Sequence, residues 1–289
     1  MNSVEHNTPV QLTDLWVPRA LDVEYYAPSI EELHTKWQTY TKGHELLTLS
    51  DDNYGACNVP QQLPRGYASV DLCEVVRNTG LSLLRMRDGN IDDMVIDVEQ
   101  GGMDYGARYN GWSADDEQAY KHRYIDEFMR HNVVEPVPFS ESVASFIRKW
   151  RARGVYVVAN TSTLVGCEKS TIDFLSESFP NCFDGILFPR NHDGKGLMTK
   201  SNALQDLKEA IAIHFDTQVD QSLPTIAIDD ALHHAAGFDK AGIRTFMPAY
   251  AWNEAAESYG AQILRIAQSF GTVDTFVAVD AYWDERLGL

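Results

Sequence analysis

The chain has 289 residues, of which 44% are hydrophobic and 23% are charged, and its formal net charge is −18. This length and composition are typical of a soluble globular protein with one large α/β domain and an insert, or with two smaller domains. The negative charge disfavours DNA or RNA as a partner, because no run of basic residues offsets it. Small anions can still be substrates if a metal ion sits in the site.

The N-terminus, the apolar runs and the cysteines predict a soluble, cytoplasmic protein that does not contact a membrane. The first eight residues are polar and lack the apolar core of a signal sequence. No apolar run approaches the roughly 20 residues of a membrane span. The four cysteines (Cys57, Cys73, Cys167 and Cys182) form no CxxC pair, as expected of reduced thiols inside a cell. Homo-oligomerisation is left open by the sequence.

Residues 1–88 contain one clear element, a helix that follows Pro28. Ser29 can cap this helix, with Glu32 as its partner in a capping box. The rest of the segment is a polar stretch followed by apolar clusters that fit no clear period. We therefore expect residues 1–88 to form an N-terminal extension of unknown role.

From residue 94 onward, short apolar runs alternate with helical patterns. A helix that Ser140 caps and that ends at Gly154 is expected, and further helices are expected from Lys200 and from Ala231 to Gly237. The apolar runs read as buried strands. They end in polar residues, namely Asp97, Asn160 with Thr161, and Asp229 with Asp230. The alternation predicts a doubly wound, mostly parallel sheet, and ligands of such sheets bind at the carboxyl ends of the strands.

Asp229 and Asp230 are two adjacent carboxylates that follow a buried strand. They would repel each other and lose hydration, so they need a cation or a hydrogen-bond donor. A solvated Asp-Asp turn at the end of a strand is the alternative, and the residues alone do not decide between the two.

The order Asp97, Thr161, Lys200 and Asp229-Asp230 resembles that of the haloacid dehalogenase-like (HAD) hydrolase superfamily. The motifs of that superfamily are an Asp-x-Asp, a Ser or Thr, a Lys and an acidic pair. Residues 139–248 carry the resemblance, through Val-Val-Ala-Asn-Thr, Thr-Lys-Ser-Asn-Ala-Leu and Ile-Ala-Ile-Asp-Asp. It implies a Rossmann-like core in residues 89–102 and 137–250 and a small helical cap in residues 103–136. Residues 251–289 would then be a C-terminal helix and tail packed on the core.

The resemblance further implies a Mg²⁺-dependent phosphatase of a small phosphate monoester, such as a nucleotide. Asp97 would attack phosphorus to form an aspartyl-phosphate, and Glu99 would protonate the leaving oxygen. Lys200 would supply positive charge to the phosphoryl oxygens. Mg²⁺ would neutralise the repulsion between nucleophile and phosphate. Its expected ligands are Asp97, the carbonyl of Glu99, Asp229 and Asp230, and the expected substrate-binding residues are Asn160, Thr161, Arg108 and Tyr109.

One departure from the family's pattern leaves alternatives open. The phosphatases carry Asp where this chain has Glu99, and a misplacement of about one ångström can cost about 100-fold in rate. A rival first motif, Asp71-Leu72-Cys73, also ends an apolar step, although Cys73 could not serve as the general acid. The alternative functions are a catalytically impaired binding or structural module and another HAD reaction such as dehalogenation. We expect His233 and His234 to be ordinary helix-surface or core residues.

Overall fold

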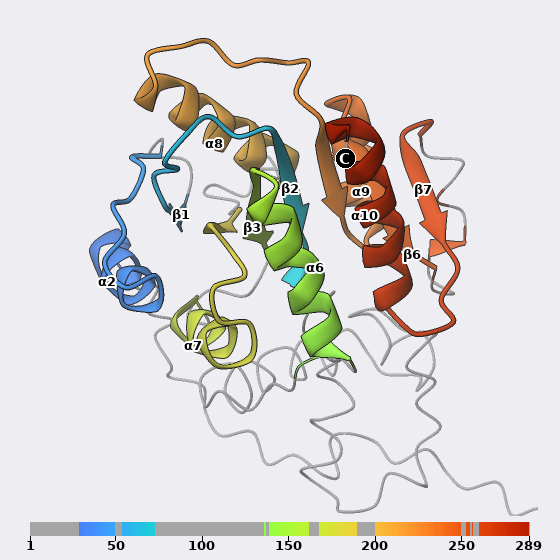
Figure 1. Cartoon of the computed structure of the whole chain (residues 1–289), viewed down its shortest axis with the longest axis horizontal. Helices are drawn as coiled ribbons and strands as arrows, with labels where there is room; N and C mark the ends of the chain where they lie inside the picture. Colours follow the sequence, from blue (N-terminus) through green and yellow to red (C-terminus); the bar gives the residue numbers. More distant parts are fainter. Residues whose placement is uncertain are drawn as a thin grey trace, which may run out of the picture.

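The computed structural model describes residues 29–49, 54–72, 136, 139–161, 168–189, 200–249, 253–254, 256 and 260–288. Within these residues a seven-stranded sheet has the order β1-β4-β3-β2-β5-β6-β7 (Figure 1). All neighbouring strands are parallel except β1 and β4, which are antiparallel. The strands are β1 (Tyr54–Cys57), β2 (Gly66–Val70), β3 (Val155–Asn160), β4 (Gly185–Phe188), β5 (Thr225–Ile228), β6 (Arg244–Pro248) and β7 (Ile263–Ile266).

Helices cover both faces of the sheet. The described helices are α2 (Ile30–Tyr40), α6 (Ser140–Ala152), α7 (Glu168–Ser178), α8 (Lys200–His214), α9 (Leu232–Lys240) and α10 (Val273–Leu287). Side chains of α2, α6, α7 and α10 share one apolar cluster with the sheet, and those of α8 and α9 share the other. Successive residues of a strand point to opposite faces, so every central strand contributes to both clusters. The predicted doubly wound, mostly parallel sheet is confirmed.

Most of the predicted helix and strand positions are confirmed, with one difference in capping. The capping box of α2 is present, because Ser29 Oγ accepts from the backbone of Glu32 and the Glu32 carboxylate accepts from the backbone of Ser29. Helix α6 begins at Ser140 as expected, but its N-cap residue is Phe139, which makes no side-chain capping hydrogen bond. Gly154 ends this helix with φ of 86°, a conformation that a glycine adopts without strain.

The described parts of residues 1–88, namely 29–49 and 54–72, belong to the core and not to a separate extension, which corrects the expectation for them. The segment 54–72 supplies β1 at the edge of the sheet and β2 near its centre, between β3 and β5. The pattern of Gly66–Val70 concealed this strand, because it consists largely of small residues and lacks a branched apolar run. At the other end of the chain β7 pairs with β6, and α10 packs against α6 and β6. The expected cap, residues 103–136, lies outside the described residues except for residue 136.

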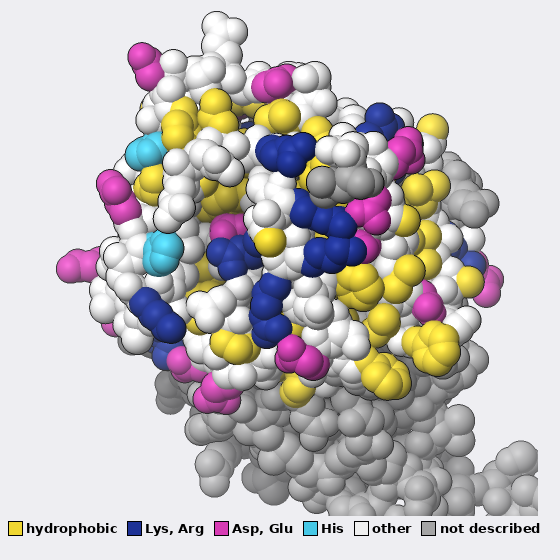
Figure 2. Space-filling view, in the orientation of Figure 1, with side chains coloured by type: hydrophobic (Ala, Val, Ile, Leu, Met, Phe, Trp, Pro, Cys, Tyr) yellow, Lys and Arg dark blue, Asp and Glu magenta, His cyan; other side chains and the backbone are white. Residues whose placement is uncertain are grey.

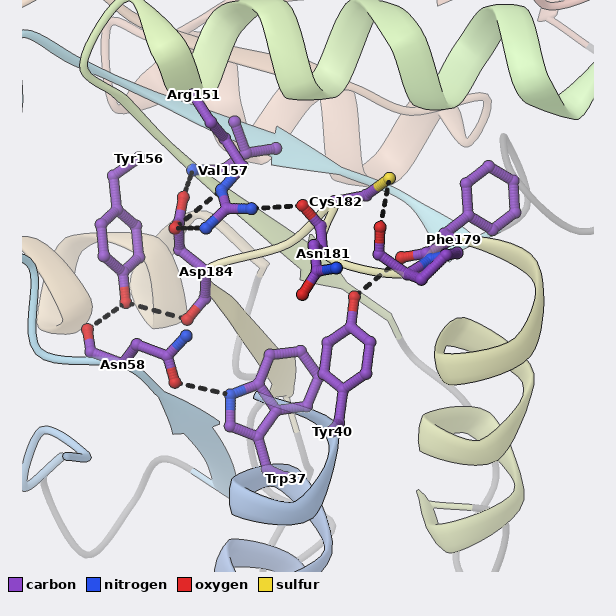
Figure 3. Close-up of polar contacts among 11 residues, drawn as sticks. Trp37, Tyr40, Asn58, Arg151, Tyr156, Val157, Phe179, Asn181, Cys182 and Asp184 are labelled. Atoms are coloured by element: carbon purple, nitrogen blue, oxygen red, sulfur yellow. Dashed lines mark hydrogen bonds and ion pairs between the residues drawn. The ribbon is translucent and has the colours of Figure 1, made fainter. Parts of the chain in front are cut away.

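A buried polar network fastens β1 and α2 to the sheet (Figure 3). Asp184 accepts hydrogen bonds from the Arg151 guanidinium and the Val157 backbone at 2.8 and 2.9 Å. The hydroxyl of Tyr156 donates to the carbonyl of Asn58 at 2.6 Å. Trp37 of α2 donates to the Asn58 side chain at 3.2 Å. Each buried polar group thus finds a partner on another element, which fixes the edge of the sheet.

Basic side chains gather over α6 and α10, which lie side by side in front of the strands (Figures 1 and 2). Lys149 and Arg153 of α6 both form ion pairs with Asp280 of α10, and Arg153 also pairs with Asp284. Below them, the rings of Trp150 and Phe276 stack with centroids 5.4 Å apart. The basic residues of this face therefore hold the two helices together despite the acidic character of the whole chain.

Among the helices of the described ranges, none has the length and apolarity required to span a lipid bilayer.

Candidate active site

Three polar side chains from neighbouring strands meet the first turn of α8. Asp71 follows β2, Asn160 ends β3 and Asp229 follows β5. The residues two positions earlier, which lie on the face of the sheet that α8 covers, are Ser69, Val158 and Ala227. Side chains two apart in a strand share a face, so all three polar side chains are directed toward that side of the sheet. Because β2 lies between β3 and β5, they come together at its carboxyl edge.

Lys200, the first residue of α8, joins two of these strand ends. Its Nζ lies 2.8 Å from Asp71 Oδ1 and 2.8 Å from Asp229 Oδ2. Lys200 is 2% exposed, Asp71 5% and Asp229 1%, so all three charges are withdrawn from water. Buried charges are tolerated only when they are paired, and the lysine supplies that pairing to both carboxylates.

The other oxygen of Asp229 is held by α9. Oδ1 accepts a hydrogen bond from the Ala231 backbone at 3.0 Å and lies 3.2 Å from His234 Nδ1. Burial opposes the charge of Asp229, yet Lys200 and His234 hold the pKa of this carboxyl well below its usual value. The sequence analysis expected His234 to be an ordinary helix-surface or core residue and so missed its contact with Asp229.

Negative charge exceeds positive charge at this edge of the sheet. Burial alone would lower the pKa of Lys200, but Asp229 and Asp71 raise it above its usual value. Burial raises the pKa of Asp71, and the nearby charge of Asp229 adds to the effect. Burial, together with the charges of Asp71 and Asp229, raises the pKa of Asp230 to about 7. Two carboxylates thus share one lysine and Asp230 lies in their field, an imbalance of charge that a bound cation would relieve.

The residues of this edge fit a magnesium ion. Carboxylate oxygens are the ligands that Mg²⁺ prefers. Ligand atoms of Asp71, Asp229 and His234 lie within 4.8 Å of one another. Both oxygens of Asp229 already have partners in Lys200, Ala231 and His234. An ion bound by Asp229 would have to share or replace one of these contacts.

Asn160 and Thr161 both lie at the carboxyl edge of the sheet, as predicted. Only Thr161 remains a candidate for binding the substrate. The side chain of Asn160 is fully buried. Its Nδ2 donates to Ser69 Oγ and to the Lys200 carbonyl, each at 3.0 Å. Both amide hydrogens are used within the protein, so the structure does not support Asn160 as a substrate-binding residue. Thr161 is 5% exposed, and its backbone nitrogen continues the β3–β4 ladder to Leu187 at 3.0 Å.

Within the described residues, the carboxylate that the rival first motif places beside Lys200 is Asp71. Asp97, Glu99, Arg108 and Tyr109 lie outside the described residues. Asp71 follows the strand between β3 and β5 and contacts Lys200 directly. The preference for Asp97 rested on the glycine pair Gly101-Gly102 and on Glu99, which are local features of the sequence. The order of strands in the sheet favours Asp71.

A cavity of about 480 Å³ lies away from this edge, between α2 and α7. Lys36 pairs with Asp173 in its wall. The cavity is open to solvent and lies beside the carboxyl ends of both helices, whose dipoles disfavour anions. The described residues of this hollow do not resemble a phosphate site.

No protein-family model and no curated protein matches this chain. Several solved structures are similar to it. One is a haloacid dehalogenase-like family hydrolase from Streptococcus pneumoniae, with 14% identity, 75% of this chain and 97% of that chain covered, and a TM-score of 0.49. Another is described as a predicted phosphatase from Clostridium acetobutylicum, with 19% identity, 79% and 100% coverage, and a TM-score of 0.46. A hydrolase from Pseudomonas syringae has 14% identity, 75% and 98% coverage, and a TM-score of 0.43.

At these identities and TM-scores the similarity concerns architecture alone. The chemistry of this chain is therefore inferred from its own site.

Proposed function

We propose that this protein is a HAD-like hydrolase that transfers a phosphoryl group from a small phosphorylated substrate to Asp71, with the help of Mg²⁺. The observation that carries the proposal is the position of Lys200 Nζ, 2.8 Å from both Asp71 and Asp229 at the carboxyl edge of the central strands. A carboxylate can act as the nucleophile in phosphoryl transfer, and a lysine and a carboxylate-bound Mg²⁺ can stabilise the charge on the phosphoryl oxygens.

Each residue of the cluster has a distinct role in this proposal. Asp71 Oδ2 attacks phosphorus, since Oδ1 faces Lys200, and the bond from phosphorus to the leaving oxygen breaks. Water then cleaves the aspartyl-phosphate, which releases inorganic phosphate and restores Asp71. Lys200 directs the nucleophile and neutralises charge on the phosphoryl oxygens. Asp229 orients Lys200, and Thr161 donates a hydrogen bond to a phosphoryl oxygen. In this arrangement Asp229 is a positioning residue and not the direct metal ligand predicted from the sequence.

Asp71 and Asp230 would hold the metal ion. A bound Mg²⁺ offsets the charge of the phosphate and so permits a carboxylate to approach it. Burial first, and the neighbouring carboxylates second, raise the pKa of both side chains, so a bound cation would favour their charged forms.

Cys73 stands two residues after Asp71, at the position where the phosphatases of the superfamily carry their acid. A thiol is a weak hydrogen-bond donor with an ordinary pKa of about 8.5, so it is a poor substitute for a carboxylic acid. We therefore expect good leaving groups, such as the carboxylate of an acyl phosphate, to be favoured over alkoxides, which need a proton. Cys73 also favours the second candidate function, a HAD-fold module that binds phosphorylated ligands with little turnover.

The test is to detect the phosphorylated aspartate directly. The protein is incubated with Mg²⁺ and acetyl phosphate. The aspartyl-phosphate formed on the protein is then reduced with borohydride, and the modified residue is located by mass spectrometry. We expect the label at Asp71, its loss in Asp71→Asn, and its retention in the matched variant Asp97→Asn. Label at Asp97 instead would restore the first motif preferred from the sequence. Absence of label from the wild-type protein would reject the enzymatic proposal and leave the binding module.

A further inference from the structure

We propose that Asn160 is a positioning residue that fixes the first turn of α8 against β2 and β3, and so holds Lys200 between its two carboxylates. The inference builds on the proposed function, in which Lys200 directs Asp71. It concerns how the lysine is held in place and can be tested independently of turnover.

The contacts of Asn160 connect three elements that are distant in sequence. The residue ends β3, and its Nδ2 reaches Ser69 Oγ of β2 and the carbonyl of Lys200 in α8, both at 3.0 Å. A carbonyl can only accept a hydrogen bond, so the nitrogen of the amide must face Lys200. This requirement fixes the orientation of the Asn160 side chain.

The position of Lys200 is therefore determined at both ends of the residue. Its carbonyl is held by Asn160, and its Nζ is held by Asp71 and Asp229. A long lysine side chain has many rotamers, and an ion pair at one end alone would not fix its backbone. With the backbone anchored, Nζ stays centred between two carboxylates that lie on different strands.

The environment of Asn160 suits a fixed polar anchor better than a ligand contact. The residue is 0% exposed, and Ser69 is 2% exposed. Both amide hydrogens are used, and Oδ1 is a buried oxygen that lacks a hydrogen-bond partner in the described part of the chain. Leaving a buried acceptor unsatisfied is unfavourable, so an apolar side chain at this position would be expected if packing alone mattered. In this inference, the hydrogen bond from Nδ2 to the Lys200 carbonyl is the role that explains an amide here despite the unsatisfied Oδ1.

The test compares Asn160→Leu, which removes both donors at similar volume, with Ser69→Ala. The second variant removes one partner of the amide and keeps the bond to Lys200. Each protein is treated with acetic anhydride, and acetylation of the Lys200 peptide is followed by mass spectrometry. In Asn160→Leu we expect Lys200 to acetylate about tenfold faster or more, because release of its backbone lowers the cost of local opening. Ser69→Ala should acetylate at the wild-type rate.

Phosphorylation of Asp71 by acetyl phosphate is measured on the same proteins. A displacement of Nζ by about one ångström should slow it about 100-fold in Asn160→Leu, without a comparable rise in the acetyl phosphate concentration for half-maximal rate. If Asn160→Leu gives no cooperative melt, Asn160→Ser replaces it, since a short hydroxyl cannot span Ser69 and Lys200 together.

Equal rates of Lys200 acetylation in the wild type and the Asn160 variant would overturn the inference, whatever the rate of Asp71 phosphorylation. A wild-type protein that forms no phosphoenzyme would reject the proposed function alone, and the acetylation rates would still decide the role of Asn160.

Discussion

Replacing Lys200 with methionine should destabilise the protein more than any other single loss of a lysine in α8. Lys200 is shared by two buried carboxylates at 2.8 Å, so Lys200→Met leaves Asp71 and Asp229 without their common cation. Removing one partner of a buried ion pair typically costs about 3–5 kcal/mol. For a domain of this size, 1 kcal/mol shifts the melting temperature by about 2–4 °C. We therefore expect Tm to fall by about 10 °C in metal-free buffer.

Lys208 provides a matched control on the same helix. It is 4% exposed, and its Nζ lies 3.4 Å from Thr225 Oγ1 and 5.5 Å from the centre of the Tyr67 ring. No ion pair to a carboxylate is found for Lys208 within the residues the structure describes. Lys208→Met should therefore cost only about 1 kcal/mol, the worth of one hydrogen bond.

The pH dependence gives the sharper test of this prediction. In Lys200→Met the unpaired carboxylates have folded-state pKa values above those of the unfolded chain. Their protonation therefore stabilises the folded state at low pH, and this contribution is lost as pH rises through the folded pKa. The Tm gap to wild type should be small at pH 5 and large at pH 8, measured by scanning calorimetry with EDTA. The reasoning is refuted if Lys200→Met and Lys208→Met have the same Tm, or if the Tm difference between Lys200→Met and the wild type is the same at both pH values.

Two further predictions concern Asp230 and Cys73. The pKa of Asp230 is raised to about 7, above its unfolded value, so its contribution to stability is lost as pH rises through 7 and metal-free Tm should fall from pH 5 to pH 8. Asp230→Asn should make Tm less dependent on pH and should remove the stabilisation by Mg²⁺. In the wild type that stabilisation is about 2.7 kcal/mol at a hundredfold excess of Mg²⁺ over Kd. If Mg²⁺ raises the Tm of Asp230→Asn as much as that of the wild type, Asp230 is not a ligand. Cys73→Asp should raise hydrolysis of an alkyl phosphate about 100-fold or more relative to acetyl phosphate, whereas Cys73→Asn should not. A ratio that is the same in all three proteins would show that position 73 does not supply the proton.

The sequence by itself determined those parts of the site that are marked by local patterns. A run of branched residues identifies β3 and β5, and the polar residues that follow them identify Thr161 and the pair Asp229-Asp230. Lys200 is found because it opens a helix with a regular apolar face. Parallel strands place such residues along one edge, so the pattern predicted both the fold class and the side of the sheet that carries the site.

Only the tertiary structure showed that Asp71 faces Lys200. Gly66–Val70 has small side chains and a weak strand signal, whereas the run before Asp97 has a strong one. The central place of β2 depends on its pairing with β3 and β5, whose residues are far away in the sequence. Strand order is a property of the whole sheet, and no local period encodes it.

The contacts that position Lys200 were likewise hidden from the sequence. Asn160 reaches a residue 91 positions earlier and another 40 positions later, and His234 reaches Asp229 across the start of α9. A single asparagine at a strand end looks like a ligand contact as readily as an anchor. Its role follows from which hydrogen-bonding groups the fold brings within 3.0 Å of its amide, and those groups come together only when β2, β3 and α8 have packed.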